Sequence, residues 1–140
     1  MEKTPSILLV DDEPDFLDNL SLTLQMAGYQ TIVARDGVEA LAILQTQPVD
    51  LIVSDISMPH IDGYKLHEQV RKDSRWATIP FLFLTGCSFL SAAEISYGKT
   101  LGVDEYFTKP IRAEELLLAV WSTLEHVQRV PPEDVAATFT

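Results

Sequence analysis

Short apolar runs alternate with segments of helical periodicity along this chain, and this alternation restricts the folds that it can adopt. Each run is four or five residues long, and the last two are rich in aromatic residues, which is typical of β-strands. Strands that alternate with helices form a mostly parallel sheet with helices on both faces. The pattern therefore predicts a doubly wound α/β fold of five strand–helix units, (βα)5. The expected strands are Ile7–Val10, Gln30–Ala34, Leu51–Ser54, Phe81–Thr85 and Glu105–Thr108.

The segments between the strands place apolar residues at helical spacing. The first is expected to open at Pro14 and to exit at Gly28, since proline suits an opening turn and glycine a helix end. The fourth, within Ser91–Leu101, has the weakest pattern. The expected apolar faces are Phe16, Leu17, Leu20, Leu24 and Ala27 in the first helix, Val38, Leu41, Ala42 and Leu44 in the second, Tyr64, Leu66 and Val70 in the third, and Leu116, Leu117, Val120, Trp121, Leu124 and Val127 in the last.

The prolines in Val130–Asp134 interrupt the last helical pattern. We therefore expect one domain over residues 1–128 and a C-terminal tail or linker over residues 129–140. A chain of 140 residues with 46% hydrophobic residues has enough apolar side chains for one compact core.

Charge and composition exclude several classes of function. A net charge of −11 argues against binding of nucleic acid through this segment, because phosphate contacts need a basic surface. The single cysteine, Cys87, rules out an internal disulfide and favours a reducing compartment. No apolar stretch is long enough to cross a bilayer, and the first residues lack the apolar core of a signal peptide. A cytoplasmic domain that does not contact the membrane is expected.

Chemically reactive residues follow four of the five predicted strands. Right-handed crossovers place the C-terminal ends of parallel strands at one edge of the sheet, where open α/β sheets bind ligands. Only the second strand has no such residue at its end. The residues expected at this edge are Asp11, Asp12 and Glu13 after the first strand, Asp55 after the third, Thr85 at the end of the fourth, and Lys109 with Pro110 after the fifth.

These side chains together suit the transfer of a phosphoryl group. Carboxylates that lie a few ångströms apart repel one another unless a cation lies among them. Oxygen ligands favour a hard ion such as Mg²⁺, and the three histidines of the chain share no metal-ligand spacing. A cation, a hydroxyl and an ammonium around one carboxylate can position a phosphoryl group and neutralise its charge. Asp55 is therefore a candidate phosphoryl acceptor.

Five motifs in this order make the chain resemble the receiver domain of bacterial two-component response regulators. Each motif alone is weak, but the set of five is specific. The resemblance covers about Ser6 to Gln128. The motifs are Leu9–Glu13, Asp55–Pro59 with Gly63, Leu84–Gly86, Gly102–Tyr106 and Phe107–Pro110.

The resemblance implies a role for each residue at this edge. Asp55 would accept the phosphoryl group, Asp12 would bind Mg²⁺ directly, and Asp11 would bind it mostly through water. The backbone carbonyl of Ser57 would be a further metal ligand. Together with Asp55 itself, these residues form the expected metal site. Thr85 and Lys109 would hold the phosphoryl oxygens.

The resemblance also implies a fold, a switch and partners. The fold would be a flavodoxin-like five-stranded parallel sheet with strand order 2-1-3-4-5. Thr85 and Tyr106 would move together after phosphorylation and change the face formed by helix 4, strand 5 and helix 5, and the Lys109–Pro110 bond would be cis. The expected partners are a histidine kinase or phosphotransfer protein, or a small phosphodonor, an output partner or domain, and a second copy through the same face.

One segment departs from the family pattern. Thr85 and Lys109 are 24 positions apart, a wider spacing than the family pattern implies, and the extra residues lie within Cys87–Thr100. The helix expected there would start late or be distorted. How the output face is built therefore stays open.

Other interpretations of the same residues are weaker. Asp11 and Asp12 could cap the first helix, since acidic residues favour helix N-termini. An aspartyl phosphatase of the haloacid dehalogenase type needs a second aspartate two residues after the first, where this chain has Ser57. A flavodoxin-like binding module would find its phosphate repelled by the acidic residues after the first strand. A pseudo-receiver would lack one of the expected chemical residues, and none is missing here.

Overall fold

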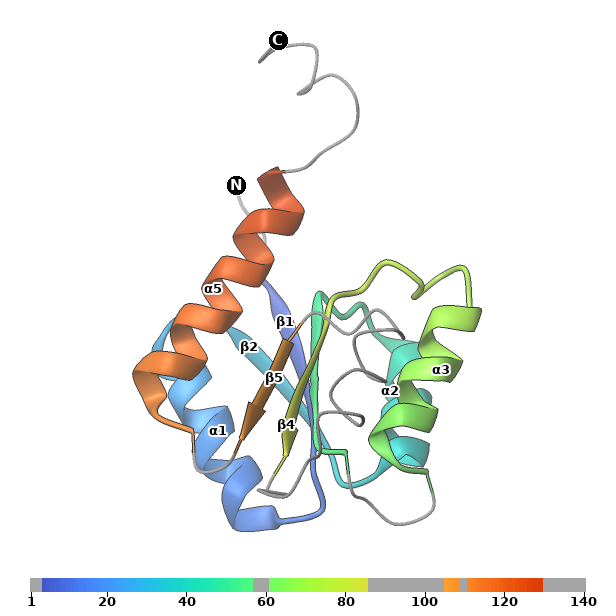
Figure 1. The fold of residues 1–140 in the computed structure, drawn as a ribbon, viewed down its shortest axis with the longest axis horizontal. Helices are drawn as coiled ribbons and strands as arrows, with labels where there is room; N and C mark the ends of the chain where they lie inside the picture. The colour runs from blue at the N-terminus through green and yellow to red at the C-terminus, as the bar shows by residue number, and fades with distance from the viewer. Residues whose placement is uncertain (1–3, 57–60, 86–104, 109–110, 130–140) are drawn as a thin grey trace, which may run out of the picture.

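The computed structural model describes residues 4–56, 61–85, 105–108 and 111–129, and within them a single parallel sheet forms the centre of the molecule (Figure 1). Every adjacent pair of strands is parallel. The strands are β1 (Ser6–Val10), β2 (Gln30–Ala34), β3 (Leu51–Ser54), β4 (Phe81–Thr85) and β5 (Glu105–Thr108), and they lie in the order β2-β1-β3-β4-β5.

Helices cover both faces of the sheet, so the predicted α/β class with a parallel sheet is confirmed. The helices α1 (Pro14–Met26) and α5 (Ala113–Arg129) lie on one face, and α2 (Gly37–Thr46) and α3 (Gly63–Lys72) lie on the other (Figure 1). The helix expected within Ser91–Leu101 lies outside the described residues. In the described part of the chain, no helix is long and apolar enough to cross a membrane.

The alternation of side chains along β1 divides the core into two layers. Leu8 and Val10 pack with the helices α2 and α3, whereas Ile7 and Leu9 pack with α1 and α5. All five residues of β1 are buried. This strand therefore lies at the centre of the fold, and its C-terminal end is held from both sides.

An aromatic cluster joins α3 to β4. The rings of Phe81 and Phe83 are 5.2 Å apart, and His67 lies edge-on to Phe81 at 5.0 Å. Tyr64 makes a similar edge contact with Phe83 at 5.1 Å. Edge-to-face packing of this kind adds to the stability gained by burying the rings.

The predicted helix faces are confirmed in α3 but are partly wrong in α1, α2 and α5. Ala27 was expected on the apolar face of α1, yet it follows the last residue of that helix and is exposed. Val38 and Trp121 were expected in the core, yet they are 53% and 54% exposed. In α5 the buried residues Leu116, Val120 and Leu124 recur every four positions. Trp121 follows Val120 by one position, about 100° further round the helix, and so faces solvent.

Local capping sets where the helices begin. The side chain of Asp36 accepts a hydrogen bond from the backbone N–H of Glu39 at 2.9 Å, and the Glu39 carboxylate accepts one from the N–H of Arg35 at 3.0 Å. This arrangement is similar to a capping box, except that Glu39 accepts from the N–H of the residue before the N-cap. Asp62 caps α3 through the N–H of Lys65 at 2.8 Å. The two cap residues hold the helix starts next to the edge of the sheet where the strands end.

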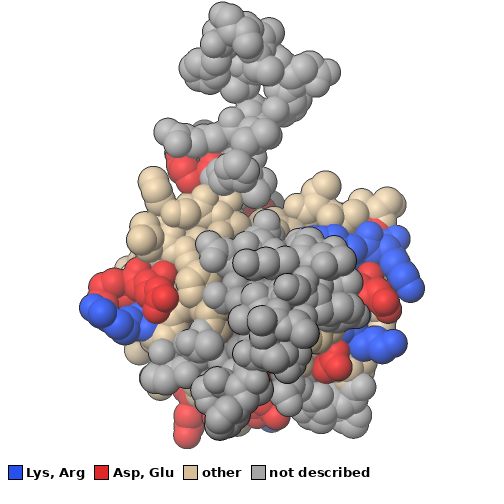
Figure 2. All heavy atoms as spheres, viewed as in Figure 1, with Lys and Arg blue, Asp and Glu red and all other residues tan. Residues whose placement is uncertain are grey.

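Most basic side chains on the face seen in Figure 2 lie beside acidic ones. Arg112 is 3.4 Å from Glu114, and Lys72 is 3.9 Å from Glu68. All four side chains are largely exposed, so these ion pairs contribute little to stability.

A tighter pair follows the end of α3. The carboxylate of Asp73 accepts hydrogen bonds from Nε and Nη2 of Arg75 at 3.0 and 2.7 Å, and from the backbone N–H of Arg75 at 2.9 Å. The Arg75 guanidinium lies 4.6 Å from the ring centre of Trp76. The hydrogen bonds from Arg75 stabilise the ionised form and lower the pKa of Asp73 to about 2.

This pair predicts a specific dependence on pH. Because the pKa of Asp73 is lower in the folded protein than its ordinary value of 3.8, its contribution to stability is present above that value and is lost as the pH falls through about 2. In Arg75→Ala, the pKa of Asp73 should rise toward 3.8. NMR titration of the side-chain carboxyl carbon in both proteins measures this change. Equal pKa values in the two proteins would contradict the assignment.

Candidate functional site

Three carboxylates come together where β1 and β3 end. Asp11 and Asp12 follow β1, and Asp55 follows β3, which is the neighbour of β1 in the sheet. The backbone N–H of Asp55 donates to the carbonyl of Val10 at 2.9 Å, so the parallel pairing continues to Asp55. One carboxylate oxygen from each of the three aspartates lies within 4.8 Å of the others.

Burial and charge make this acidic group unusual. Asp11 and Asp55 are only 3% and 6% exposed, whereas Asp12 is exposed to solvent. Oδ1 of Asp11 accepts a hydrogen bond from the N–H of Glu13 at 2.9 Å, and Oδ1 of Asp55 accepts one from the N–H of Ile56 at 2.8 Å. These bonds hold the two carboxylates in place. The negative charges nevertheless repel one another at this distance.

A hard divalent cation suits this donor set. Each aspartate can offer one oxygen ligand to a shared ion, and among the described residues no histidine or cysteine belongs to the group. Such oxygen ligands are what Mg²⁺ and Ca²⁺ prefer, and Mg²⁺ commonly binds through one or two carboxylates plus water. The acidic group can therefore hold a metal ion, as expected from the sequence.

Helix capping does not explain the two aspartates after β1. The residue at the N-cap of α1 is Glu13, and its side chain makes no capping hydrogen bond. Asp11 bonds to the N–H of Glu13, which precedes the helix. Capping of the first helix, the simpler interpretation of Asp11 and Asp12, is therefore not what the structure shows.

Gly63, the first residue of α3, packs directly against the backbone at Asp55. A Cβ on Gly63 would overlap the carbonyl oxygen of Asp55, and it would lie 2.8 Å from Cα of Ile56 and 2.9 Å from Cε1 of Phe83. The Gly63 N–H also donates to the carbonyl of Ile56 at 2.7 Å. The absence of a side chain at Gly63 thus allows α3 to begin against the end of β3.

Of the other expected site residues, the backbone positions of Thr85 and Tyr106 are described. Thr85 ends β4, which pairs with β3, so it belongs to the same edge of the sheet as Asp55. Tyr106 lies on β5, opposite Phe83. Nothing is described of the side chains of Thr85 and Tyr106. Three further predictions concern residues outside the described part of the chain, namely Ser57, Lys109 and Pro110.

The structure shows a close contact near the acidic group between two residues that belong to none of the sequence motifs, Gly37 and Ile61. Ile61 belongs to the loop before α3, and Gly37 is the first residue of α2. Their close approach is visible only in three dimensions, because 24 positions separate them in the sequence. A glycine at the first position of a helix, where alanine would be favoured, is the one signal in the sequence.

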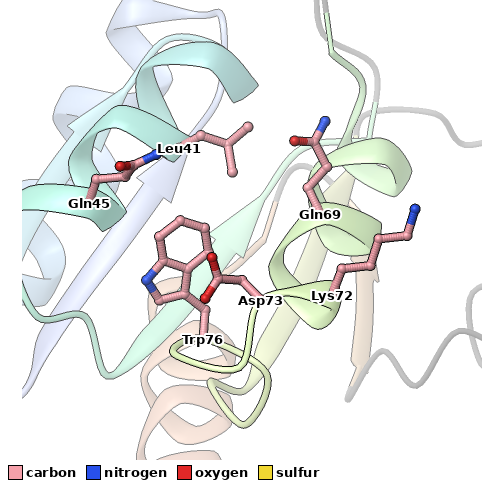
Figure 3. A pocket seen from close by; sticks show the side chains of 6 residues that line it. All are labelled: Leu41, Gln45, Gln69, Lys72, Asp73 and Trp76. Atoms are coloured by element: carbon pink, nitrogen blue, oxygen red, sulfur yellow. The ribbon is translucent and has the colours of Figure 1, made fainter.

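A hollow of about 330 Å³ between α2 and α3 is a second candidate site (Figure 3). Its one carboxylate, on Asp73, is hydrogen-bonded to Arg75, and Lys72 lies 3.9 Å from Glu68. It adjoins the end of α3 that is remote from Gly63 and Asp55. This hollow therefore lacks the clustered carboxylates of the acidic group. Its lining residues are Leu41, Gln45, Gln69, Lys72, Asp73 and Trp76.

Comparison with known proteins identifies a family for this arrangement. Residues 7–121 match the family described as the response regulator receiver domain. The chain is 39% identical over 128 residues to the DNA-binding dual master transcriptional regulator RpaA of Synechocystis, covering 91% of this chain and 52% of that protein. It is 37% identical over 138 residues to the response regulator MprA of Mycobacterium avium, covering 96% and 58%. The chain thus spans about half the length of these curated relatives.

Two solved structures share this fold. The chemotaxis protein CheY4 of Vibrio cholerae superposes with a TM-score of 0.80 at 35% identity, covering 86% of this chain and 98% of that chain. A CheY-like response regulator receiver domain protein from Methanospirillum hungatei superposes with a TM-score of 0.85 at 26% identity, covering 92% and 100%.

Titration with Mg²⁺ tests the acidic group directly. We expect Mg²⁺ to shift the backbone amide resonances of Glu13 and Ile56, because both N–H groups donate to carboxylates of the group. Asp12→Asn should weaken binding about tenfold or more, since it removes a charged ligand. Asp15→Asn makes the same change of charge on the nearby first turn of α1 and is the control. Equal Mg²⁺ affinity in the two variants would contradict a metal site that includes Asp12.

Proposed function

The chain belongs to the response regulator receiver domain family, and from that premise we propose that Asp55 accepts a phosphoryl group in a Mg²⁺-dependent reaction. The position and burial of Asp55 are the main support for this role. Asp55 is a 94% buried carboxylate at the end of a central strand, with two further aspartates beside it. Three carboxylates this close together favour a bound divalent cation, and such a cation would also neutralise charge on an incoming phosphoryl group.

In the proposed reaction, a carboxylate oxygen of Asp55 attacks phosphorus in the donor. The bond from phosphorus to the leaving atom breaks, and that atom keeps the bonding electrons. A bound Mg²⁺ would neutralise negative charge on the phosphoryl oxygens. The hydrogen bond from the N–H of Ile56 to Oδ1 of Asp55 restricts rotation of the carboxylate and so helps to fix the orientation of the nucleophile.

The proposal assigns the remaining roles as the family resemblance implies. The metal ligands are Asp11, Asp12, Asp55 and the backbone carbonyl of Ser57. The position of Thr85 at the end of β4, beside β3, supports its proposed contact with a phosphoryl oxygen. Lys109 is the second proposed phosphate ligand, and the Lys109–Pro110 peptide bond is proposed to be cis. A shift of Thr85 and Tyr106 would carry the signal outward.

The proposal extends to the whole receiver and its partners. It includes five complete βα units in strand order 2-1-3-4-5, with the domain over residues 1–128 and a tail or linker over residues 129–140. The phosphate would come from a histidine kinase, a phosphotransfer protein or a small phosphodonor. The output would pass to a partner or a further domain, and two copies could meet through the face of helix 4, strand 5 and helix 5. A cytoplasmic location is supported by the single cysteine.

Phosphorylation of Asp55 gives the first test. Incubation with acetyl phosphate and Mg²⁺ should add one acid-labile phosphate, and Asp55→Asn should abolish it because the amide is a far weaker nucleophile. Asp18→Asn, an exposed change of the same type on α1, is the matched control. Intact mass spectrometry measures the added phosphate. Labelling of Asp55→Asn at the rate of the starting protein, or labelling without Mg²⁺, would refute the proposal.

Removal of the lysine separates metal binding from switching. Lys109→Ala should keep its affinity for Mg²⁺, because the lysine is proposed to contact phosphate and not metal. After addition of acetyl phosphate, its NMR spectrum should lack the changes on β5 and α5 that appear in the starting protein. Loss of Mg²⁺ affinity in Lys109→Ala, or a normal set of shifts after phosphorylation, would contradict this role.

A further inference from the structure

Gly37, the first residue of α2, contacts Ile61, which lies just before α3. A Cβ on Gly37 would lie 2.9 Å from Cβ, 3.0 Å from Cγ2 and 3.2 Å from the carbonyl oxygen of Ile61. The 2.9 Å contact with Cβ requires one of the partners to move, and Cβ is bonded directly to the Ile61 backbone, so it cannot swing away as the end of a flexible side chain could. Ile61 therefore occupies this place only because residue 37 has no side chain.

Backbone conformation does not account for the glycine. Among the described glycines, only Gly28 has a φ in the left-handed region, at 100°. Gly37 is the first residue of α2, where intrinsic helix propensity favours alanine. The contact with Ile61 is thus the physical reason for a glycine here.

Ile61 is linked to the acidic group by a short, tightly packed path. Asp62 follows it and caps α3 through the N–H of Lys65. Gly63 comes next, and it packs on the backbone of Asp55 and donates a 2.7 Å hydrogen bond to the carbonyl of Ile56. A displacement of Ile61 therefore shifts the neighbouring residues Asp62 and Gly63, and this shift changes the contact between Gly63 and the backbone of Asp55.

We propose that Gly37 is a positioning residue for the metal and phosphoryl site, acting through Ile61 and Gly63 on Asp55. The inference rests on the proposed function of Asp55. It gives a role to β2, the one strand that has no reactive side chain at its end. The glycine after β2 leaves room for Ile61 at the start of α3, and Gly63, two residues later, packs against the backbone of the acceptor Asp55.

The variant Gly37→Ala tests the proposal. We expect its affinity for Mg²⁺ to fall about tenfold, which is the loss typical of mutations in residues that support metal ligands. Labelling by acetyl phosphate should slow in parallel. The amide resonances of Asp55 and Ile56 should also move without any Mg²⁺ present. Titration followed by NMR gives both the affinity and the shifts.

Gly28→Ala is the matched control. It also places a methyl group on a glycine, and it destabilises the fold because its φ of 100° disfavours a side chain. Nothing lies within 4 Å of the added Cβ. This variant should lose thermal stability yet keep the Mg²⁺ affinity and the Asp55 and Ile56 resonances of the starting protein. A loss of affinity equal to that of Gly37→Ala would overturn the proposal, because general destabilisation would then explain both.

Removal of the Ile61 side chain should rescue Mg²⁺ binding in the Gly37→Ala variant. Ile61→Gly eliminates the Cβ and Cγ2 atoms that Gly37→Ala would meet. The Gly37→Ala change should therefore alter Mg²⁺ affinity less than twofold in the Ile61→Gly background, since direct contacts are the source of coupling in such cycles. If Gly37→Ala alone fails to fold, the double variant should regain both folding and Mg²⁺ binding. An equal loss in both backgrounds would refute the contact as the cause.

The outcomes separate this inference from the proposed function. If the starting protein takes up no phosphate on Asp55, the proposed function fails, and the metal-free shifts of Asp55 and Ile56 still decide whether Gly37 positions them. If the starting protein is phosphorylated and Gly37→Ala behaves identically, only the positioning role is refuted.

Discussion

The parallel pairing of β1 with β3 is the interaction on which the acidic group depends. It extends one step beyond the strands, through the hydrogen bond from the N–H of Asp55 to Val10. Two carboxylates less than 5 Å apart repel by about 3–4 kcal/mol at an effective dielectric constant of 20. Burial of one leucine or isoleucine contributes about 1.5–3 kcal/mol. The several apolar residues buried on β1 and β3 therefore outweigh this repulsion, and the sheet holds together charges that would otherwise separate.

Close packing behind the strands converts this edge of the sheet into a rigid site. Gly63 allows α3 to begin against Asp55, and the ring of Phe83 on β4 approaches the same position. Tyr64 and His67 then pack on the aromatic residues of β4. Because interiors of this density deform little, a shift of Asp55 requires movement of β3 and α3 together. The same rigidity suits a group whose state has to be sensed elsewhere in the fold.

Much of the architecture could be predicted from the sequence, because strand and helix periods are local properties. Four strands have the predicted bounds, and β1 begins one residue earlier, at Ser6. The grouping of Asp11, Asp12 and Asp55 also followed, since parallel strands end at one edge of a sheet. The faces of α2 and α5 were harder to predict. Val38 and Trp121 belong to apolar runs in which several residues compete for the core, and only the position of the sheet selects which are buried.

The sequence by itself determined the class of fold, the family and the residues available for chemistry, because these follow from periodicity, composition and motif spacing. The tertiary structure alone decided which oxygens approach one another and which glycines are required. Gly37 begins α2 and Ile61 lies just before α3, and their contact depends on how β2 and β3 are placed on either side of β1. Such a contact arises from packing between distant segments, so it has no local signature in the chain.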